Sequence, residues 1–281
     1  MNQMYQLLTF LSLILLSISC SNPNEKKNNE GDKSSILEHK NELQQILDSS
    51  KVKGAILLYD NKEDTYYSND FEWSKSGFLP ASTFKIPNSI IALETGVVEN
   101  DSTLMQWDGN PRGLKIWEQD LIFKKAFQYS CVPCYQEVAR KIGTERMQSY
   151  LEKLDYPGMV FDSTSIDRFW LMGDSRISPF SEIDFLKRIH FSQLPVKEST
   201  DFTIKRMLLM EEYEHYKLSG KTGWSNENDH NNGWFVGFLE LSNNTIFFAT
   251  NIEPSEEFDM KDFPKARKAV TIEALKNLNY L

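Results

Sequence analysis

Apolar and polar positions follow different periods in different parts of this chain. A continuous apolar run over residues 54–60 and a shorter one over 65–67 predict two strands around a turn. Helical spacings dominate the middle, and strand patterns return after residue 216. The predicted helices cover residues 82–98, 135–142, 145–154, 183–191, 204–216 and 266–278, and the later strands cover 216–224, 233–241 and 245–252. This order predicts an α+β fold: an antiparallel sheet built from both termini, flanked by helices, with a mainly helical second lobe.

The segment that opens the folded part also has a helical pattern. Apolar side chains recur at helical spacings over residues 36–47, namely Leu37, Leu43, Ile46 and Leu47. Ser35 is a suitable N-cap, and Glu38 follows it at the spacing of a capping box. We therefore expect a helix to begin at residue 36.

The first 35 residues indicate export. Residues 7–18 are almost entirely apolar, too few to span a bilayer but sufficient for the hydrophobic region of a signal peptide. Cys20 follows small residues, as in a lipoprotein processing site; a plain secretion signal and a buried N-terminal helix are the alternatives. Residues 21–35 are polar and cannot form a core. We expect a signal peptide over 1–19, a flexible tether over 20–35 and a folded domain over 36–281.

Composition narrows the possible partners. Hydrophobic residues make up 40% and charged residues 25% of the chain, enough for a buried core. The formal net charge of −9 disfavours nucleic-acid binding through a broad basic face. Three cysteines are too few for a disulfide scaffold.

The first candidate for chemistry is Ser82-Thr83-Phe84-Lys85 at the start of a predicted helix. A helix places residues three apart on one face, where a lysine of lowered pKa can activate a serine nucleophile. The signal is weak alone, because Ser50 and Lys53 have the same spacing. Its alternative interpretation is a serine that caps the helix and a lysine exposed to solvent.

Two further short motifs follow. Ser130-Cys131-Val132 could deliver a hydroxyl that passes a proton to a leaving group, or it could be a loop before a helix. Lys221-Thr222-Gly223 lies in a predicted strand; its first two side chains offer donors to a carboxylate, and Gly223 allows a close approach to the strand backbone. An exposed edge strand is the alternative.

Together the three motifs are far more specific than each alone. Penicillin-recognising serine enzymes carry Ser-x-x-Lys, Ser-Asp-Asn and Lys-Thr-Gly. With Ser-x-Val in the middle, the chain resembles the class D (oxacillinase-type) serine β-lactamases across residues 36–281. The stretches that carry the resemblance are residues 80–88, 106–109, 129–133, 135–137, 169–171, 177–179, 220–223 and 233–237.

The resemblance implies a serine nucleophile and an unusual base. Ser82 would be acylated, and Lys85 would act as an N6-carboxylysine formed with CO2 or bicarbonate; no other cofactor and no metal is implied. The Trp170 indole matches the tryptophan that bonds the carbamate. An apolar wall that keeps the lysine amine neutral could come from Phe84, Val132, Trp170 and Leu171.

The resemblance also implies the substrate contacts. Ser130 would pass a proton toward the lactam nitrogen, and the backbone N–H groups of Ser82 and Trp224 would form an oxyanion hole. The remaining residues expected around the cleft are Lys221, Thr222 and Gly223 along its wall, Arg267 on the substrate carboxylate, Val132 and Leu171 as a gate over the lysine, and Trp107 in a neighbouring loop.

Three features depart from the family pattern or add to it. The family usually carries Tyr-Gly-Asn where this chain has Tyr156-Pro157-Gly158, so no catalytic role is assigned there. Cys131 and Cys134 are spaced as Cys-x-x-Cys; we expect buried thiols without a function, with a disulfide as the alternative. The histidines show no metal-ligand spacing, and residues 211–214 suggest a solvated helix end.

The expected function is hydrolysis of β-lactam antibiotics, which gives resistance. The alternatives are a β-lactam sensor that stays acylated, a penicillin-binding transpeptidase and, outside the family, a lipid-anchored binding protein. The expected partner is a small β-lactam; nucleic acid is not expected, membrane attachment would use a lipid on Cys20, and the chain would be a monomer or homodimer. The expected location is the periplasm of a Gram-negative-type bacterium, as a membrane-anchored lipoprotein.

Overall fold

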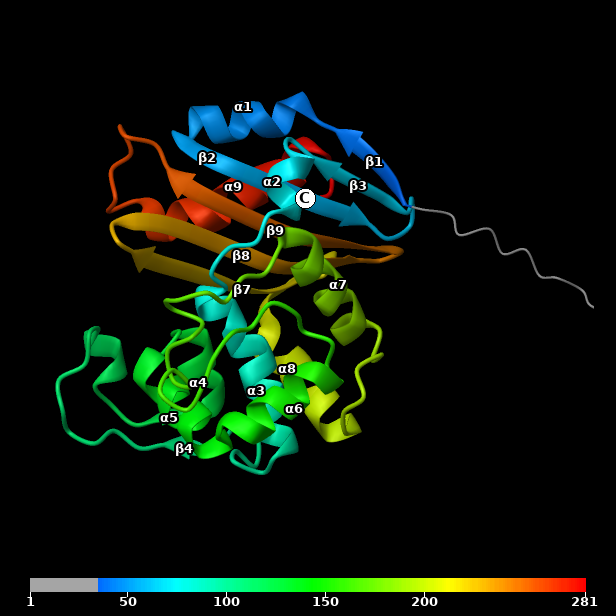
Figure 1. The fold of residues 1–281 in the computed structure, drawn as a ribbon. Coiled ribbons are helices and arrows are strands. Elements are labelled where there is room, and N and C mark those ends of the chain that lie inside the picture. The colour runs from blue at the N-terminus through cyan, green and yellow to red at the C-terminus, as the bar shows by residue number, and fades with distance from the viewer. Residues whose placement is uncertain (1–34) are drawn as a thin grey trace, which may run out of the picture. The chain divides into compact units, whose positions relative to one another are not determined.

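A seven-stranded sheet organises residues 35–281, the part of the chain that this computed structural model describes (Figure 1). Its strand order is β1-β3-β2-β9-β8-β7-β6. The bounds are β1 Ile36–His39, β2 Val52–Asp60, β3 Thr65–Ser68, β6 Leu209–Glu212, β7 Tyr216–Glu227, β8 His230–Leu241 and β9 Asn244–Pro254. A second sheet pairs β4 (Leu104–Met105) with β5 (Leu121–Ile122). Strands from both ends of the folded part meet where β2 pairs with β9 along its whole length, as the sequence predicts.

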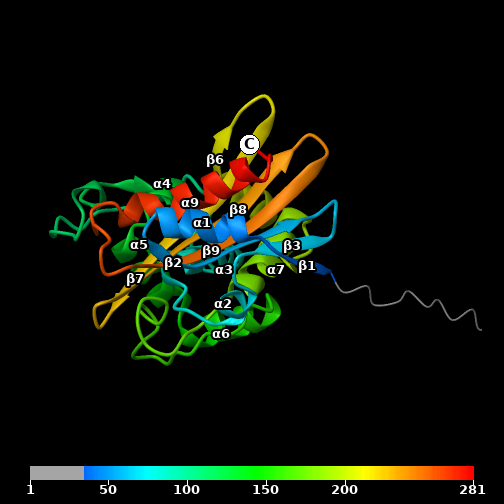
Figure 2. The ribbon, with the colours of Figure 1, turned by 90° about the horizontal axis from the view of Figure 1, so that it is seen from above.

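Helices cover both faces of the large sheet. The bounds are α1 Asn41–Ser49, α2 Phe71–Lys75, α3 Lys85–Glu94, α4 Phe123–Gln128, α5 Val132–Ile142, α6 Thr144–Lys153, α7 Pro179–His190, α8 Glu198–Leu208 and α9 Phe263–Asn277, with 3-10 turns η1 Ala81–Phe84 and η2 Lys115–Trp117. Figure 2 shows α1 and α9 side by side on one face, where they pack on β2, β8 and β9. The helical lobe around α3 to α6 lies on the other side (Figure 1). The predicted α+β architecture agrees with this arrangement.

Two hydrophobic cores follow from these layers. One fills the helical lobe and includes Phe84, Ile90 and Trp170. The other lies between the sheet and the pair α1 and α9, and includes Leu47 and Phe263. Both cores are built from apolar faces that recur at helix or strand periods, so each element buries one side.

The predicted helix over residues 36–47 is wrong in its first turn. Residues 36–39 form β1, which pairs in parallel with β3: Ile36 N donates to Asp64 O over 3.1 Å, and Lys40 N donates to Ser68 O over 2.9 Å. Ile36 and Leu37 are 58% and 51% exposed, so no helix face buries them. The helix begins only at Asn41, because the apolar residues that reach the core lie after that point.

The predicted helix over residues 204–216 also ends early. α8 stops at Leu208, and the next four residues form β6 against β7, with a register shift between Leu209 and Glu211. Glu211 and Glu212 therefore lie on an edge strand and not on a solvated helix end. Their carboxylates pair over 2.6 Å with Lys268 and Lys217. Strand pairing with β7 overrides the local helical pattern here.

Several short elements were not predicted, among them α2, α4 and the second sheet. The predicted signal segment, Cys20 and the tether up to residue 34 lie outside the described residues. Within residues 35–281, no helix has the length and apolar character needed to cross a membrane.

Candidate active site

The first motif sits in a turn that presents a serine to a lysine. Ser82 lies in η1, and Lys85 is the first residue of α3. Lys85 Nζ donates to Ser82 Oγ over 2.9 Å. Ala81 has a φ of 51°, and its N–H donates to Trp170 O over 2.8 Å, which fixes the entry into the turn. Ser82 caps no helix, because the N-cap of α3 is Phe84, which makes no side-chain cap bond.

Lys85 is fully buried, so the interpretation as an exposed charge is wrong. Burial lowers the pKa of Lys85 from 10.5 to about 7. Its Nζ lies 5.2 Å from the centre of the Tyr135 ring. Phe84 stacks on Trp170 at a ring distance of 5.3 Å, and both are fully buried. The Tyr135 ring therefore lies near the amine, and Phe84 and Trp170 of the predicted apolar wall pack on each other in the same core.

Trp170 has a free donor in this apolar surrounding. Its Nε1 is buried and has no hydrogen-bond partner within the described part of the chain. A buried N–H without an acceptor costs free energy, about 1–3 kcal/mol, unless a bound group satisfies it. Val132 and Leu171, the other members of the predicted wall, are partly buried.

The second and third motifs meet directly. Lys221 in β7 donates from Nζ to Ser130 Oγ and, over 2.9 Å, to Thr222 O. Ser130 lies between α4 and α5 with a φ of 52°. The hydroxyl thus comes from the helical lobe and the amine from the sheet, and their hydrogen bond links the two.

Arg267 reaches the same strand from α9. Its Nη1 donates to Gly223 O over 2.5 Å, and its Nη2 donates to Pro264 O over 3.1 Å. Gly233 makes this possible, because a Cβ at Gly233 would lie 2.8 Å from Arg267 Cδ. Burial lowers the pKa of Arg267 to about 10, and its Nε is buried without a partner among the described residues.

The site gathers three basic side chains, Lys85, Lys221 and Arg267. Burial lowers the pKa of Lys221 well below its ordinary value, and the charges of Lys85 and Arg267 lower it further. None of these three side chains forms an ion pair with an acidic side chain of residues 35–281. The Arg267 guanidinium, whose pKa of about 10 keeps it charged at neutral pH, can therefore attract an anion, so the arrangement suits a substrate that carries a carboxylate.

Gly223 brings β7 against the nucleophile turn. A Cβ at Gly223 would lie 3.1 Å from Pro80 O and 3.3 Å from Ser82 N. The group that approaches the strand backbone closely at Gly223 is therefore the turn that carries Ser82. Trp224 follows with a half-exposed indole that donates to Asn231 Oδ1 over 2.9 Å.

The side chains of Trp107 and Thr222 form no hydrogen bond with the other predicted site residues within residues 35–281. Trp107 lies in the loop between β4 and β5, where its Nε1 donates to Asn110 O over 2.7 Å and its N–H donates to Asp120 over 2.8 Å. Neither side chain joins the hydrogen-bonded network of the site.

Sequence reasoning missed Glu182. This carboxylate is fully buried in α7 and accepts hydrogen bonds from Thr83 over 2.7 Å and from Tyr156 over 3.3 Å. Burial raises the pKa of Glu182 to about 7. A signal existed, because Glu182 lies at helical spacing with the buried Pro179 and Leu186 on an otherwise apolar face.

The altered segment 156–158 also belongs to this support. Tyr156 is buried and donates to Glu182, and a Cβ at Gly158 would overlap Arg176 O. The segment therefore packs behind the nucleophile turn, on the side of Thr83.

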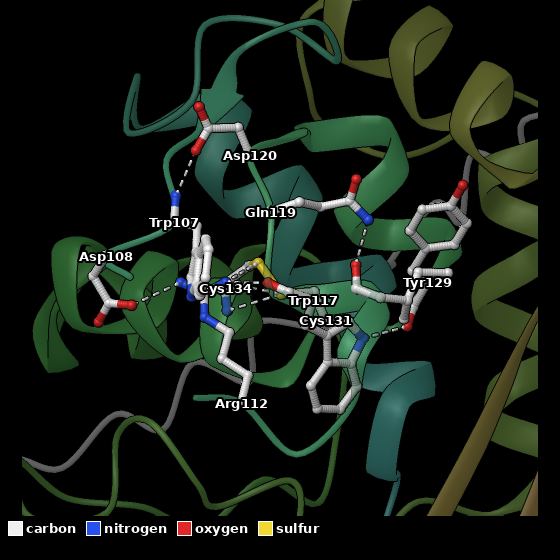
Figure 3. The surroundings of a disulfide bond; sticks show 10 residues. Trp107, Asp108, Arg112, Trp117, Gln119, Asp120, Tyr129, Cys131 and Cys134 are labelled. Carbon is white, nitrogen blue, oxygen red and sulfur yellow. Dashed lines mark hydrogen bonds and ion pairs between the residues drawn. A yellow bond between two sulfur atoms is a disulfide. The ribbon is translucent and has the colours of Figure 1, made fainter. Parts of the chain in front are cut away.

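The expectation of two buried thiols at Cys131 and Cys134 is wrong. The structure joins them in a disulfide with a Cα–Cα distance of 5.4 Å (Figure 3). The first turn of α5 brings residues three apart to the separation that a disulfide needs. Separately, no group of three or more His, Cys, Asp or Glu side chains in the described chain could hold a metal ion.

Comparisons with known proteins agree with this geometry. Residues 48–275 match the family model described as penicillin-binding protein transpeptidase domain. Beta-lactamase OXA-10 of Pseudomonas aeruginosa is 39% identical over 209 residues, covering 73% of this chain and 78% of that protein. Beta-lactamase OXA-48 of Klebsiella pneumoniae is 38% identical over 226 residues, covering 80% and 83%.

Solved structures and one regulatory protein extend the comparison. The class D β-lactamase YbXI from Nostoc has a TM-score of 0.80 and 41% identity, covering 84% of this chain and 98% of that one. The regulatory protein BlaR1 of Bacillus licheniformis is 33% identical over 209 residues, which are 74% of this chain but only 34% of that protein.

Proposed function

Since this chain belongs to the class D serine β-lactamases, which are hydrolases, we propose that it opens the lactam ring with Ser82 and releases the product with Lys85 as general base. Hydrolysis of β-lactams is the activity of the family. The observation that best supports the assignment is the 2.9 Å contact between Lys85 Nζ and Ser82 Oγ at a fully buried amine. A neutral amine at that distance can accept the hydroxyl proton.

Ring opening begins at Ser82. Its Oγ attacks the lactam carbonyl carbon as the hydroxyl proton leaves toward Lys85, and the carbonyl oxygen gains negative charge. The backbone N–H groups of Ser82 and Trp224 are the proposed donors to that oxygen, and the loss of one such donor costs about 2.7–4 kcal/mol. The contact of Gly223 with Ser82 N supports this, because it places the two backbone segments side by side.

Departure of the lactam nitrogen requires a proton. Ser130 is the proposed donor, and it is held by Lys221, whose lowered pKa makes proton exchange with the hydroxyl easy. The carbon–nitrogen bond then breaks and leaves an ester on Ser82. The substrate carboxylate would lie against Lys221, Thr222 and Arg267, whose guanidinium has no carboxylate partner among the described residues.

An N-carboxylated Lys85 fits the residues around it. Only a neutral amine adds CO2, and burial gives Lys85 a pKa of about 7. Trp170 Nε1 is a buried donor without an acceptor and would hold the added carboxylate. When present, the group supplies a carboxylate base for the Ser82 hydroxyl and for the hydrolytic water. Val132 and Leu171 would limit the access of bulk water to it.

A second candidate function is a β-lactam sensor that is acylated but does not turn over. The 33% identity to BlaR1 over 209 residues supports it, although the matched part is only about a third of that protein's length. The sensor would use the same nucleophile and would differ only in the fate of the ester. A transpeptidase would likewise be acylated by a β-lactam without rapid turnover.

Steady-state hydrolysis of the chromogenic cephalosporin nitrocefin tests the proposal. We expect many turnovers per molecule, a rise in rate on adding bicarbonate, and a loss of about a thousandfold or more in Ser82→Ala and Lys85→Ala. Lys53→Ala is the matched control, since Lys53 is exposed and has the same spacing from Ser50. A stoichiometric burst without turnover would support the sensor or transpeptidase, and equal rates in all variants would overturn the assignment of the site.

We also propose that the activity protects a bacterium from β-lactams in the periplasm, with Cys20 as the lipid anchor. The support is the signal-like apolar run and the small residues before Cys20, both of which precede the described residues. Incorporation of radiolabelled palmitate that is lost in Cys20→Ala would support the anchor. A rise in the inhibitory concentration of ampicillin on expression would support the resistance role.

A further inference from the structure

The disulfide lies inside the turn that carries the proposed proton donor. Cys131 directly follows Ser130, and the bond to Cys134 closes a ring around the first turn of α5. Both cysteines are buried, with exposed fractions of 0% and 2%. Val132, the proposed gate residue, lies within that ring.

Ser130 has a backbone conformation that its neighbours must hold. Its φ of 52° lies in the left-handed region that a residue with a Cβ rarely adopts. Ser130 N donates to Phe127 O over 3.1 Å, and Cys131 N donates to Ala126 O over 2.9 Å, so α4 fixes one side. On the side toward α5, Tyr135 N donates to Cys131 O over 3.2 Å and Cys134 N donates to Cys131 Sγ over 3.3 Å, and the disulfide adds a covalent bond to these two contacts.

The disulfide is also the contact surface for the loop that carries Trp107. Arg112 Nη1 lies 3.8 Å from Cys131 Sγ and 3.6 Å from Cys134 Sγ, and it donates to Trp117 O over 3.1 Å (Figure 3). Trp117 Nε1 in turn donates over 2.9 Å to the carbonyl of Tyr129, the residue before Ser130. The loop and the turn are therefore linked on both sides of Ser130.

We propose that Cys131 and Cys134 are a positioning pair, whose disulfide holds the Ser130 hydroxyl at Lys221 for ring opening. The proposal rests on the function assigned to Ser130 above. Because Ser130 gives up its proton as the carbon–nitrogen bond breaks, the disulfide serves acylation. Hydrolysis of the ester depends on Lys85, which α3 carries, and the disulfide should affect it less than acylation, through Val132 alone.

Two double variants separate the covalent bond from the helix cap. Cys131→Ser with Cys134→Ala keeps a side-chain acceptor for the N–H of residue 134, whereas Cys131→Ala with Cys134→Ala removes it as well. In stopped-flow single turnovers with a penicillin, we expect the acylation rate constant of the first variant to fall about tenfold, part of what a general acid contributes. Its deacylation rate constant should change less than about twofold.

Reduction of the unmodified protein supplies an independent measurement. Dithiothreitol transfers two electrons and two protons to the bond, which gives two cysteine thiols and the cyclic disulfide of the reagent. Wild-type protein refolded from urea with dithiothreitol should acylate as slowly as the first double variant. The same variant refolded with and without the reagent is the control and should show one rate.

The outcomes decide between positioning and stability. Equal loss in both rate constants, or loss that follows a fall in far-UV circular dichroism, assigns the disulfide to stability and overturns the proposal. Unchanged acylation in the reduced protein and in the double variants overturns it as well. If the oxidised wild type does not turn over β-lactams, the proposed function is contradicted instead. That outcome is distinguishable, because turnover would then be absent whether or not the cysteines are present.

Discussion

At the scale of single residues, two buried titratable side chains surround the nucleophile turn. Lys85 and Glu182 are both fully buried, and neither forms an ion pair with another residue of the described chain. Burial lowers the pKa of the amine and raises that of the carboxyl, each to about 7. Both groups are therefore stabilised in their neutral forms, which suits an apolar site.

Glu182 makes a testable contribution to the pH dependence of stability. Its pKa is higher in the folded than in the unfolded state, so its contribution is complete below about pH 4.5 and is lost as pH rises through about 7. Glu182→Gln keeps an acceptor for Thr83 but cannot ionise. Relative to this variant, wild type should lose roughly 3 kcal/mol of unfolding free energy between pH 4.5 and pH 9.

Urea unfolding of both proteins across this pH range measures the difference. Glu182→Ala is the companion variant, because it removes the acceptor as well as the charge. Its unfolding free energy should be lower than that of Glu182→Gln at every pH. Parallel curves for wild type and Glu182→Gln would show that Glu182 does not titrate in this range.

The sequence indicated the reactive residues but not their support. Ser82, Lys85, Ser130 and Lys221 carry short motifs whose order is informative, and the structure brings them together in two bonded pairs. Glu182 supports the turn from a distant helix, and only a fold places it there. The pattern of apolar and polar residues gives the spacing of side chains along one element. The contact between α7 and η1 depends on tertiary packing, which that pattern does not contain.

At the scale of elements, the contact between β7 and η1 determines the position of Ser82. Gly223→Ala would place a methyl group 3.1 Å from Pro80 O and 3.3 Å from Ser82 N, so the strand must move by a few tenths of an ångström. We expect kcat/KM for nitrocefin to fall about tenfold, because a small displacement at an oxyanion donor has a large effect on rate. Thermal unfolding should change little.

Gly113→Ala is the control for this change. Its new methyl group would meet only Trp117, at 3.6 Å, which is ordinary van der Waals contact. We expect its rate to match wild type. A normal rate in Gly223→Ala would show that the turn tolerates the displacement and that the close packing is not needed for the reaction.

Element prediction failed where pairing overrides local preference. Helices α5 and α6 and the long strands β7, β8 and β9 were predicted within a few residues, since their apolar periods are regular. Residues 36–39 and 209–212 had helical patterns and became strands, because each lies beside an open edge of the sheet. Edge pairing depends on the neighbouring strand, which local sequence does not contain.

At the scale of the whole molecule, the two cores should separate stability from activity. Leu47 is fully buried in the core between α1, α9 and the sheet, which contains none of the proposed catalytic residues. Leu47→Ala should reduce the unfolding free energy by about 2–5 kcal/mol and leave kcat/KM of the folded protein unchanged. Urea unfolding and nitrocefin rates well below the melting temperature provide the measurement.

Ile90→Ala makes a similar cavity in the other core, which contains Phe84 and Trp170. We expect this variant to lose both stability and rate, because the cavity lies in α3, the helix that Lys85 begins. Equal effects of the two variants on rate would show that the cores are mechanically coupled and that the sheet does not separate them.

The edge strand β6 has a consequence for how separate molecules meet. An unpaired strand edge offers free backbone N–H and C=O groups to any other extended chain, which makes it a site for polymerisation. In β6 the register shift interrupts that row of groups, and two ion pairs, Glu211 with Lys268 and Glu212 with Lys217, flank it. A foreign strand could add only by removing water from those charges. The strand that completes the sheet therefore also opposes its growth from one molecule into the next.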